Sequence, residues 1–335
     1  MQSPSLQRAA APEEGAPPRS MPRKPSRLRK WLPLLGLVLL AWVLSRLDLG
    51  QMGAAFARVS AGSVAFSCVF FVLNLWLKVL RWQRLLRAQG IHLPHRVALA
   101  AFLSSQFYAQ VTVGRVGEFL RIEALMERGV GPGTALAACI FDRLLDVYAV
   151  LCAGVCFGAF WLGDLRLAAL AVALMLALAL MGAWAMQLLG REHTFLQRAQ
   201  RWPLAARVLH HARELVQGVR PMLAVRPLLE AACWTVCAWC LYLAALFALA
   251  DGLHIAVSRV LLTATAAFAA LSSLLPVTIS GLGARELIYI QVLRARGVSG
   301  EDAATLSLLH LAVMSAMAIG MGLLGSLWRA RQRSV

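Results

Sequence analysis

Six long apolar segments constrain this chain more than any other feature of its sequence. Each approaches the ~20 residues that an α-helix needs to cross the hydrocarbon of a bilayer. The segments are 31–47, 63–80, 138–161, 167–189, 228–250 and 303–327. Hydrophobic residues make up 60% of the 335 residues and charged residues 15%, whereas a soluble domain is about half apolar and about a quarter charged. The sequence therefore predicts an all-α polytopic membrane protein with six full transmembrane helices.

The basic residues predict how these helices are oriented. The formal net charge is +17, and cytoplasmic loops of membrane proteins carry most of the Lys and Arg. Basic residues collect in a proline-rich tail, which we expect to be disordered, after the second segment, in a loop of amphipathic helices and at the C-terminal end. These regions are 1–30, 78–96, 190–227 and 329–335. We expect all four to face the cytoplasm.

Two further apolar stretches, 97–127 and 259–296, are interrupted by glycine and charge. The regions on either side of each stretch are predicted to lie on one face of the membrane, so each stretch must enter and return as a re-entrant, broken hairpin. The membrane domain, 31–328, then divides into repeat one, 31–161, and repeat two, 167–327, of opposite orientation. Inverted repeats with broken helices are a recurrent architecture of secondary transporters.

The two breaks carry similar motifs, GRVGEFLR from Gly114 and GLGARELI from Gly281. Each places glycines before a glutamate that opens a short apolar helix, and free N–H groups at a helix start suit an anion. The candidate site residues of the hairpins are Arg115, Glu118, Arg121, Gly281, Gly283, Arg285 and Glu286. Ionisable residues at membrane depth are functional candidates. The alternatives are a chance likeness of two glycine-rich loops, a capping role for Glu118, and an Arg285 that only pairs with Glu286 or Glu118.

A further charged cluster lies in segment 138–161. Asp142 and Asp146 share a helix face at i, i+4, and Arg143 reaches Asp146 at i+3. The alternative is an ion pair at the cytoplasmic boundary. His310 is the only histidine inside a predicted crossing, and it is either a possible proton relay, because an imidazole titrates near neutral pH, or a helix-packing residue.

Several function classes are excluded. The seven cysteines all lie in apolar runs, and their odd number speaks against a disulfide framework. The sequence contains no nucleotide-binding, serine-hydrolase or zinc-protease motif. The basic residues are not interleaved with aromatics in a soluble segment, as nucleic-acid binding requires. We therefore expect no cofactor, no metal and no nucleic-acid partner.

Three motifs carry a family resemblance: GRVGEFLR at 114–121, DRLLD at 142–146 and LPVTISGLGARE at 275–286. Together with the Arg81-Trp82 pair, their order and spacing resemble those of the lysylphosphatidylglycerol synthase transmembrane-region family, also described as flippase-like membrane proteins. The resemblance covers most of the chain from about residue 31 to residue 328. It implies a polytopic inner-membrane protein of bacteria or archaea that moves a lipid between leaflets.

This chain departs from the best-known relatives in two ways. They fuse the membrane domain to a soluble synthase that attaches lysine to phosphatidylglycerol, whereas this chain ends seven residues after Trp328, so we expect no aminoacyl transfer. Val113 stands where the family often has proline. Stand-alone members resemble flippases for glycolipids, polyprenyl-phosphate sugars or hopanoid-type lipids.

The sequence thus predicts a lipid flippase or lipid transporter of the bacterial inner membrane, with both termini in the cytoplasm. Arg115, Arg121, Arg143 and Arg285 are predicted to form a polar path for an anionic, phosphate-bearing headgroup, because the planar guanidinium matches phosphate oxygens. Two alternatives stay open: a headgroup transferase that uses Asp142 with Asp146, and a non-transporting scaffold for a separately encoded lipid-modifying enzyme or glycosyltransferase. The lipid, the direction, the coupling ion and the oligomeric state stay open as well.

Overall fold

The computed structural model describes residues 38–164, 214–273 and 281–333, together with short stretches between 166 and 181. The predicted tail 1–30 lies outside the described residues. So do most of the crossing predicted at 167–189 and most of the loop at 190–227.

All regular structure in the described part of the chain is helical, as predicted. Residues 38–44 are helical, and the first half of the chain continues with α2 (Leu49–Arg58), α3 (Ala61–Ala88), α4 (His95–Val111), the 3₁₀-helix η1 (Val113–Leu120), α5 (Arg121–Met126) and α6 (Pro132–Leu162). The second half contains the 3₁₀-helix η2 (Arg220–Leu223), α10 (Val225–Gly252), α11 (Arg259–Ser272), α12 (Ala284–Arg294) and α13 (Gly300–Arg333).

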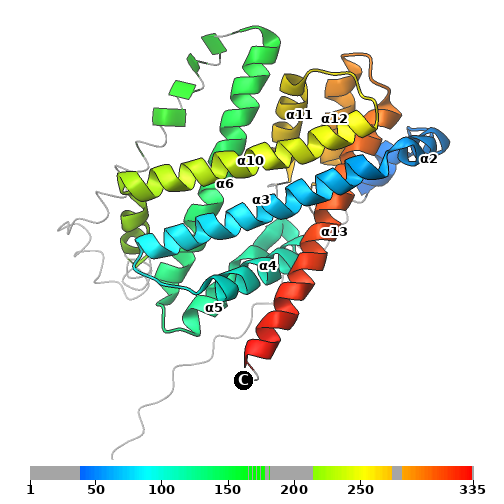
Figure 1. Cartoon of the computed structure of the whole chain (residues 1–335). Helices are drawn as coiled ribbons and strands as arrows, with labels where there is room; N and C mark the ends of the chain where they lie inside the picture. Colours follow the sequence, from blue (N-terminus) through cyan, green and yellow to red (C-terminus); the bar gives the residue numbers. More distant parts are fainter. Residues whose placement is uncertain are drawn as a thin grey trace, which may run out of the picture.

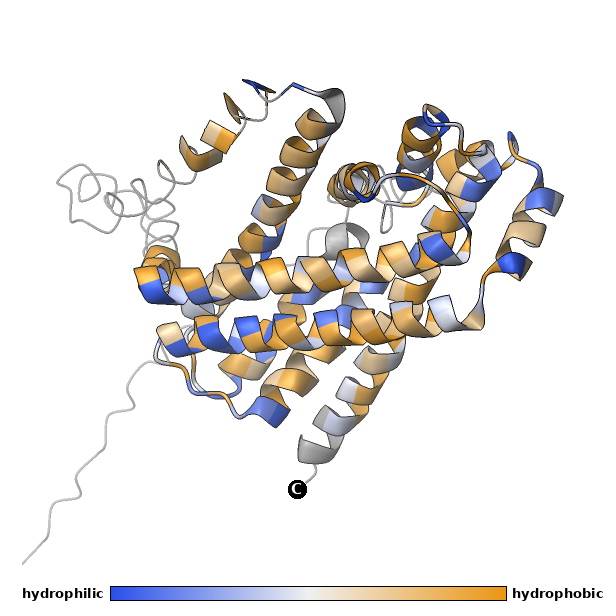
Figure 2. Ribbon diagram, turned by 45° about the horizontal axis from the view of Figure 1, so that its top comes forward, coloured by the Kyte–Doolittle hydropathy of each residue, from blue (hydrophilic) through white to orange (hydrophobic). Residues whose placement is uncertain are grey.

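Three of the described helices are long and apolar enough to cross a membrane: Ala61–Ala88, Val225–Gly252 and Gly300–Trp328. They correspond to the segments predicted at 63–80, 228–250 and 303–327. The fourth long helix, α6, has 31 residues and contains the charged run 142–146. Large apolar side chains such as Phe66, Val236 and Leu324 are exposed on these helices, and Figure 2 shows hydrophobic colouring along them. Exposed apolar faces of this kind are expected on helices that contact the hydrocarbon of a lipid bilayer.

Local sequence explains where several helices begin and end. Ser60 caps α3 by accepting a hydrogen bond from the Ser63 N–H, and Ser258 caps α11 in the same way. Pro132 opens α6, where its missing N–H costs nothing, and Gly163 ends that helix in the left-handed conformation at φ 74°. Asp48 caps α2, and hydrogen bonds from the backbone N–H groups of Gln51 and Gly50 lower the pKa of its carboxyl group.

Helices from the first half of the chain pack against helices from the second half (Figure 1). The long helices α3 and α10 lie side by side. α4 from the first half of the chain packs along α13, the last helix of the second half. Conversely, α11 from the second half packs along α6 of the first. One apolar core joins α3, α4, α5 and α6, and another joins α2 with α10, α11, α12 and α13.

Both predicted breaks are present, although the backbone differs between them. After α4 the chain extends at Thr112 (φ −108°, ψ 138°) and then forms η1, in which Gly117 lies directly against the backbone of Tyr108 and Ala109. A side chain at Gly117 has no space. Before α12, Gly281 and Gly283 take positive φ values of 82° and 86°, which only glycine adopts without strain. Residues 274–280, including Pro276, lie outside the described residues.

Small residues allow α4 and α13 to approach closely. A Cβ atom at Gly322 would lie 2.5 Å from Phe107 Cβ and 2.8 Å from the Leu103 carbonyl oxygen. A Cβ atom at Gly325 would lie 2.9 Å from Leu103 Cβ. Small residues at helix interfaces are a general means of packing helices inside membranes.

These contacts predict opposite effects for two glycines of the same helix. Gly322→Ala should lower the free energy of unfolding by about 1–3 kcal/mol, because the new methyl group overpacks the interface with α4. Gly320→Ala is the matched control, since a Cβ atom there meets nothing within 4 Å. It should leave stability unchanged or raise it by up to ~1 kcal/mol, because alanine favours helix more than glycine does. Thermal unfolding of the detergent-purified protein measures both, and equal effects would contradict the packing described.

Candidate functional site

Arg81 is the centre of a buried ion cluster between α3, α6 and α10. Its side chain is 0% exposed. The guanidinium contacts Asp142 Oδ1 at 2.8 Å and Asp146 Oδ1 at 2.7 Å, and it also donates to the Thr235 hydroxyl of α10 at 2.9 Å. One side chain from α3 thus contacts two carboxylates that lie one turn apart on α6.

Arg121, at the first position of α5, binds the same cluster. Its Nη2 atom donates to Asp142 Oδ2 at 2.8 Å, so both carboxylate oxygens of Asp142 are bound by arginine. The guanidinium also lies over two aromatic rings, with Cζ 5.3 Å from the centroid of Trp82 and 4.9 Å from that of Phe102. The ring faces attract the buried cation. Arg121 therefore ties the break after α4 to α6.

Asp146 differs from Asp142 because it borders open space. Its Oδ2 atom accepts a hydrogen bond from Lys78 Nζ at 3.0 Å, while its Oδ1 atom is held by Arg81. Asp146 and Lys78 both line a cavity.

Arg143 contacts Glu118 rather than Asp146. Its Nη1 atom lies 3.3 Å from Oε1 and 3.4 Å from Oε2 of the Glu118 carboxylate in η1. The i+3 contact predicted with Asp146 is wrong, because Asp146 turns towards Lys78 and Arg81 of α3, whereas Arg143 lies about 60° away round the helix and turns towards η1. Glu118 thus has a partner from α6.

Arg285 lies at the start of α12, and among the described residues it forms no hydrogen bond or ion pair with Glu286 or Glu118, the glutamates predicted as its partners. Its Nε atom donates to the Ser307 hydroxyl at 3.2 Å, and its Cζ atom lies 5.7 Å from the Tyr289 ring centroid. Glu286 instead caps α12, because its Oε2 atom accepts from the Gly283 N–H at 2.6 Å and its Oε1 atom from Ser307 at 3.1 Å. Among the described residues, Arg285 Nη2 is buried without a hydrogen-bond partner.

His310 is 1% exposed, and its ring lies 5.0 Å from the ring of Tyr242, centroid to centroid. Neither ring nitrogen has a hydrogen-bond partner within the described part of the chain. The role of proton relay stays a prediction.

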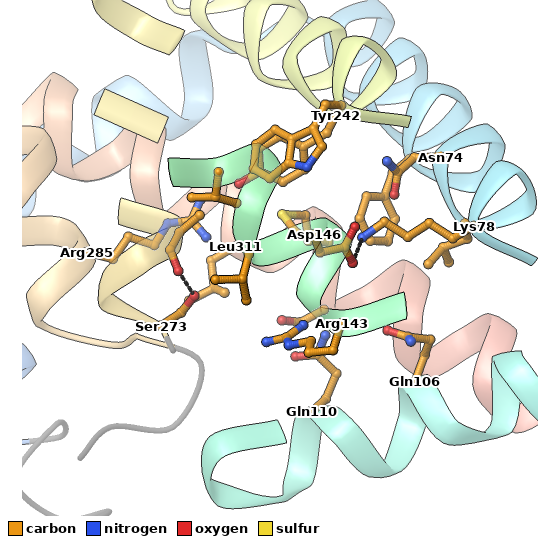
Figure 3. Close-up of a pocket in the computed structure, with 18 residues that line it drawn as sticks. Asn74, Lys78, Gln106, Gln110, Arg143, Asp146, Tyr242, Ser273, Arg285 and Leu311 are labelled. Carbon is orange, nitrogen blue, oxygen red and sulfur yellow. Dashed lines mark hydrogen bonds and ion pairs between the residues drawn. The ribbon is translucent and has the colours of Figure 1, made fainter. Parts of the chain in front are cut away.

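A cavity of about 950 Å³, including its open mouth, lies between these groups (Figure 3). Its charged lining residues are Lys78, Arg143, Asp146 and Arg285. Neutral polar side chains complete the polar part of the wall: Asn74, Gln106, Gln110, Trp239, Tyr242, Ser273 and Ser315. The remaining lining is apolar and includes Phe71, Leu75 and Met314. Figure 3 shows Lys78 and Asp146 meeting on one side of this space and Arg285 on another.

Comparison with protein-family models identifies the chain. The family described as "Lysylphosphatidylglycerol synthase TM region" matches residues 32–322. The chain belongs to this family. The match confirms the resemblance predicted from the motifs, and it establishes a membrane protein of a family related to lipid handling. A search of the curated proteins found no match.

The structure brings most of the predicted site residues of this family member together, in two layers. Arg143, Asp146 and Arg285 line the cavity, while Arg121 and Asp142 lie behind it in the ion cluster. Gly281 and Gly283 form the turn that places Arg285. The side chain of Arg115 lies outside what the structure describes. Among the described residues, no group of three or more His, Cys, Asp and Glu side chains is arranged to hold a metal ion.

Two charged residues of the site were not predicted. Lys78 and Arg81 were predicted to be cytoplasmic charges, whereas both pair with carboxylates of α6. A usable signal was present: Asn74, Lys78 and Arg81 recur at i, i+4 and i+7, and neither glycine nor proline interrupts 63–89. The helix therefore continues past residue 80 and carries one polar face into the protein.

Removing the Arg81 charge should strongly destabilise this protein. Arg81→Gln removes the buried cation that contacts both Asp142 and Asp146, and loss of one partner of a buried ion pair costs about 3–5 kcal/mol. Arg84→Gln, one turn further along the same helix, is the control, because Arg84 is half exposed and lies 3.7 Å from Glu230. Thermal unfolding measures both. A mild Arg81→Gln effect would contradict the role of the cluster.

Proposed function

We propose that this protein is a lipid transporter that moves a lipid with an anionic headgroup between the leaflets of the bacterial inner membrane. The observation that carries the proposal is the polar cavity, which lies among apolar helices and is lined by three cations and one carboxylate. Charged side chains inside a membrane protein are costly and mark substrate pathways. Family membership supports a role in lipid handling.

The chemistry of the lining suits a lipid phosphate. Arg143 and Arg285 present planar guanidinium groups, whose N–H donors match pairs of phosphate oxygens. Arg143 contacts Glu118 at 3.3 Å, and Arg285 Nη2 has no hydrogen-bond partner among the described residues. Both cations can therefore bind an incoming anion without the loss of a short ion pair. The acyl chains stay in the lipid around the helices.

An inverted repeat of six crossings and two broken hairpins is the architecture we propose for this function. Two regularities support it. Helices α3 and α10 both have 28 residues and begin 164 positions apart, at Ala61 and Val225, and α4 and α11 begin at the same spacing, at His95 and Arg259. The packing is also crossed between the halves. α4 of the first half packs along α13 of the second, and α11 of the second half packs along α6 of the first.

The carboxylates hold the cations in place in this proposal. Arg81, Arg121 and Asp142 position the wall of the cavity, and Glu118 orients Arg143. Both oxygens of Asp142 accept from arginine, so Asp142 is a poor general base, which counts against the headgroup-transferase alternative.

Because the sequence has no nucleotide-binding motif, the movement is downhill or coupled to an ion. Both termini lie in the cytoplasm, and a separately encoded lipid-modifying enzyme or glycosyltransferase supplies the lipid.

Reconstitution tests the transport proposal. Phosphatidylglycerol labelled on an acyl chain is placed in phosphatidylcholine vesicles, and its exchange between leaflets is followed by chemical quenching from outside. The wild-type protein should accelerate exchange over empty vesicles. Arg143→Ala and Arg285→Ala should each slow it by about tenfold or more, because hydrogen bonds to charged groups contribute about 1.5–3 kcal/mol.

Arg58→Gln is the control variant for this assay, because Arg58 is exposed and pairs with Asp302 away from the cavity. It should exchange the lipid at the wild-type rate. The proposed function is contradicted if wild-type vesicles exchange the lipid no faster than empty ones, or if the two arginine variants match the wild type.

A further inference from the structure

Asp146 of the ion cluster is paired with two cations, one of which borders the cavity. Arg81 contacts its Oδ1 atom at 2.7 Å, and Lys78 contacts its Oδ2 atom at 3.0 Å. The two cations differ in their surroundings. The Arg81 side chain is 0% exposed, whereas that of Lys78 is 24% exposed and lines the cavity. One partner is enclosed, and the other borders open space.

Only Lys78 can leave this carboxylate at a modest cost. If Arg81 moved away, its fully buried guanidinium would lose both carboxylates and its bond to Thr235, and Asp142 and Asp146 would each keep one cation. Removing one partner from a buried ion pair is strongly unfavourable. If Lys78 moves away, Asp146 keeps Arg81 and stays neutralised. Lys78 also has a flexible stem of four carbons that carries its ammonium group, so the charge can move without any movement of α3.

The cavity already contains the other cations that a bound anion needs. Lys78 comes from α3, Arg143 from α6 and Arg285 from α12, so three helices present positive charge to one space. Asp146 is the one carboxylate among the described lining residues. The lining therefore carries an excess of two positive charges. An anion in this space gains attraction from three sides, while a cation is repelled.

We propose that Lys78 is a headgroup-binding residue that exchanges Asp146 for the phosphate of the transported lipid, while Arg81 keeps Asp146 neutralised. The inference rests on the proposed function, because it assigns the ligand of that cavity as a lipid phosphate with a net negative headgroup. A phospholipid whose headgroup bears an added lysine is a poor ligand for this chain, because its cationic end meets the excess positive charge of the wall.

Binding measurements separate this role from a structural one. The full chain is purified in detergent and titrated with short-chain phosphatidylglycerol, phosphatidylcholine and lysylphosphatidylglycerol, and affinity is derived from the rise in unfolding temperature with ligand concentration. The wild type should bind phosphatidylglycerol most tightly. Lys78→Gln should weaken that binding by about tenfold to a hundredfold, which corresponds to the loss of one charge-assisted hydrogen bond. Lys78→Arg should retain most of the affinity.

The lipid-free protein supplies the second measurement. Lys78→Gln should unfold within a few degrees of the wild type, because Arg81 still holds Asp146, whereas Arg81→Gln should unfold far below it. Arg84→Gln, an exposed charge on the same helix, should bind phosphatidylglycerol as the wild type does. The proposal is overturned if Lys78→Gln binds phosphatidylglycerol with wild-type affinity, or if its lipid-free stability falls as far as that of Arg81→Gln.

The transport assay distinguishes this inference from the proposed function. If wild-type vesicles exchange no lipid but Lys78→Gln has lost binding, the transport function fails and the binding role of Lys78 stands. If wild-type vesicles exchange lipid and Lys78→Gln does so at the same rate, transport stands and the role of Lys78 is overturned.

Discussion

The bridge from Arg81 to Asp142 and Asp146 is the interaction on which the site depends. Three buried charges inside an apolar bundle are stable only together, because each alone would lose its hydration without compensation. Their mutual attraction fixes the register of α3 against α6, and Arg121 extends the bridge to the break after α4. The position of the cavity wall follows, since Lys78, Arg143 and Asp146 extend from the two helices that this bridge joins.

The two halves of the chain differ sharply in charge, although their elements follow the same order. α6 and α13 begin 168 residues apart, at Pro132 and Gly300, and Glu118 and Glu286 have the same spacing. At that spacing the buried pair Arg121 and Asp142 corresponds to Tyr289 and His310. In the proposed repeat, the first half thus keeps an ion cluster where the second half has aromatic side chains. The cavity is asymmetric, with most of its charge on one wall.

Hydrophobicity alone predicted the helical class and the three apolar spans found among the described residues. Both breaks were predictable, because glycines next to charge interrupt apolar runs at 114–118 and 281–286. The partners were not. Whether Arg143 faces Asp146 or Glu118 depends on the rotation of α6 relative to η1, which no local pattern specifies. Arg81 was misassigned because a basic residue near the end of an apolar run resembles a topological charge until its distant carboxylates are known.

The crossed packing of the helices has a mechanical consequence. α4 packs along α13, and α11 packs along α6, so both α4 and α11 are held by a helix from the opposite half of the sequence. In the transport that we propose, a rocking motion that opens the cavity to alternate sides would keep α4 with α13 and α11 with α6. The moving bodies would then contain helices from both halves of the chain, and the boundary between them would run through each half.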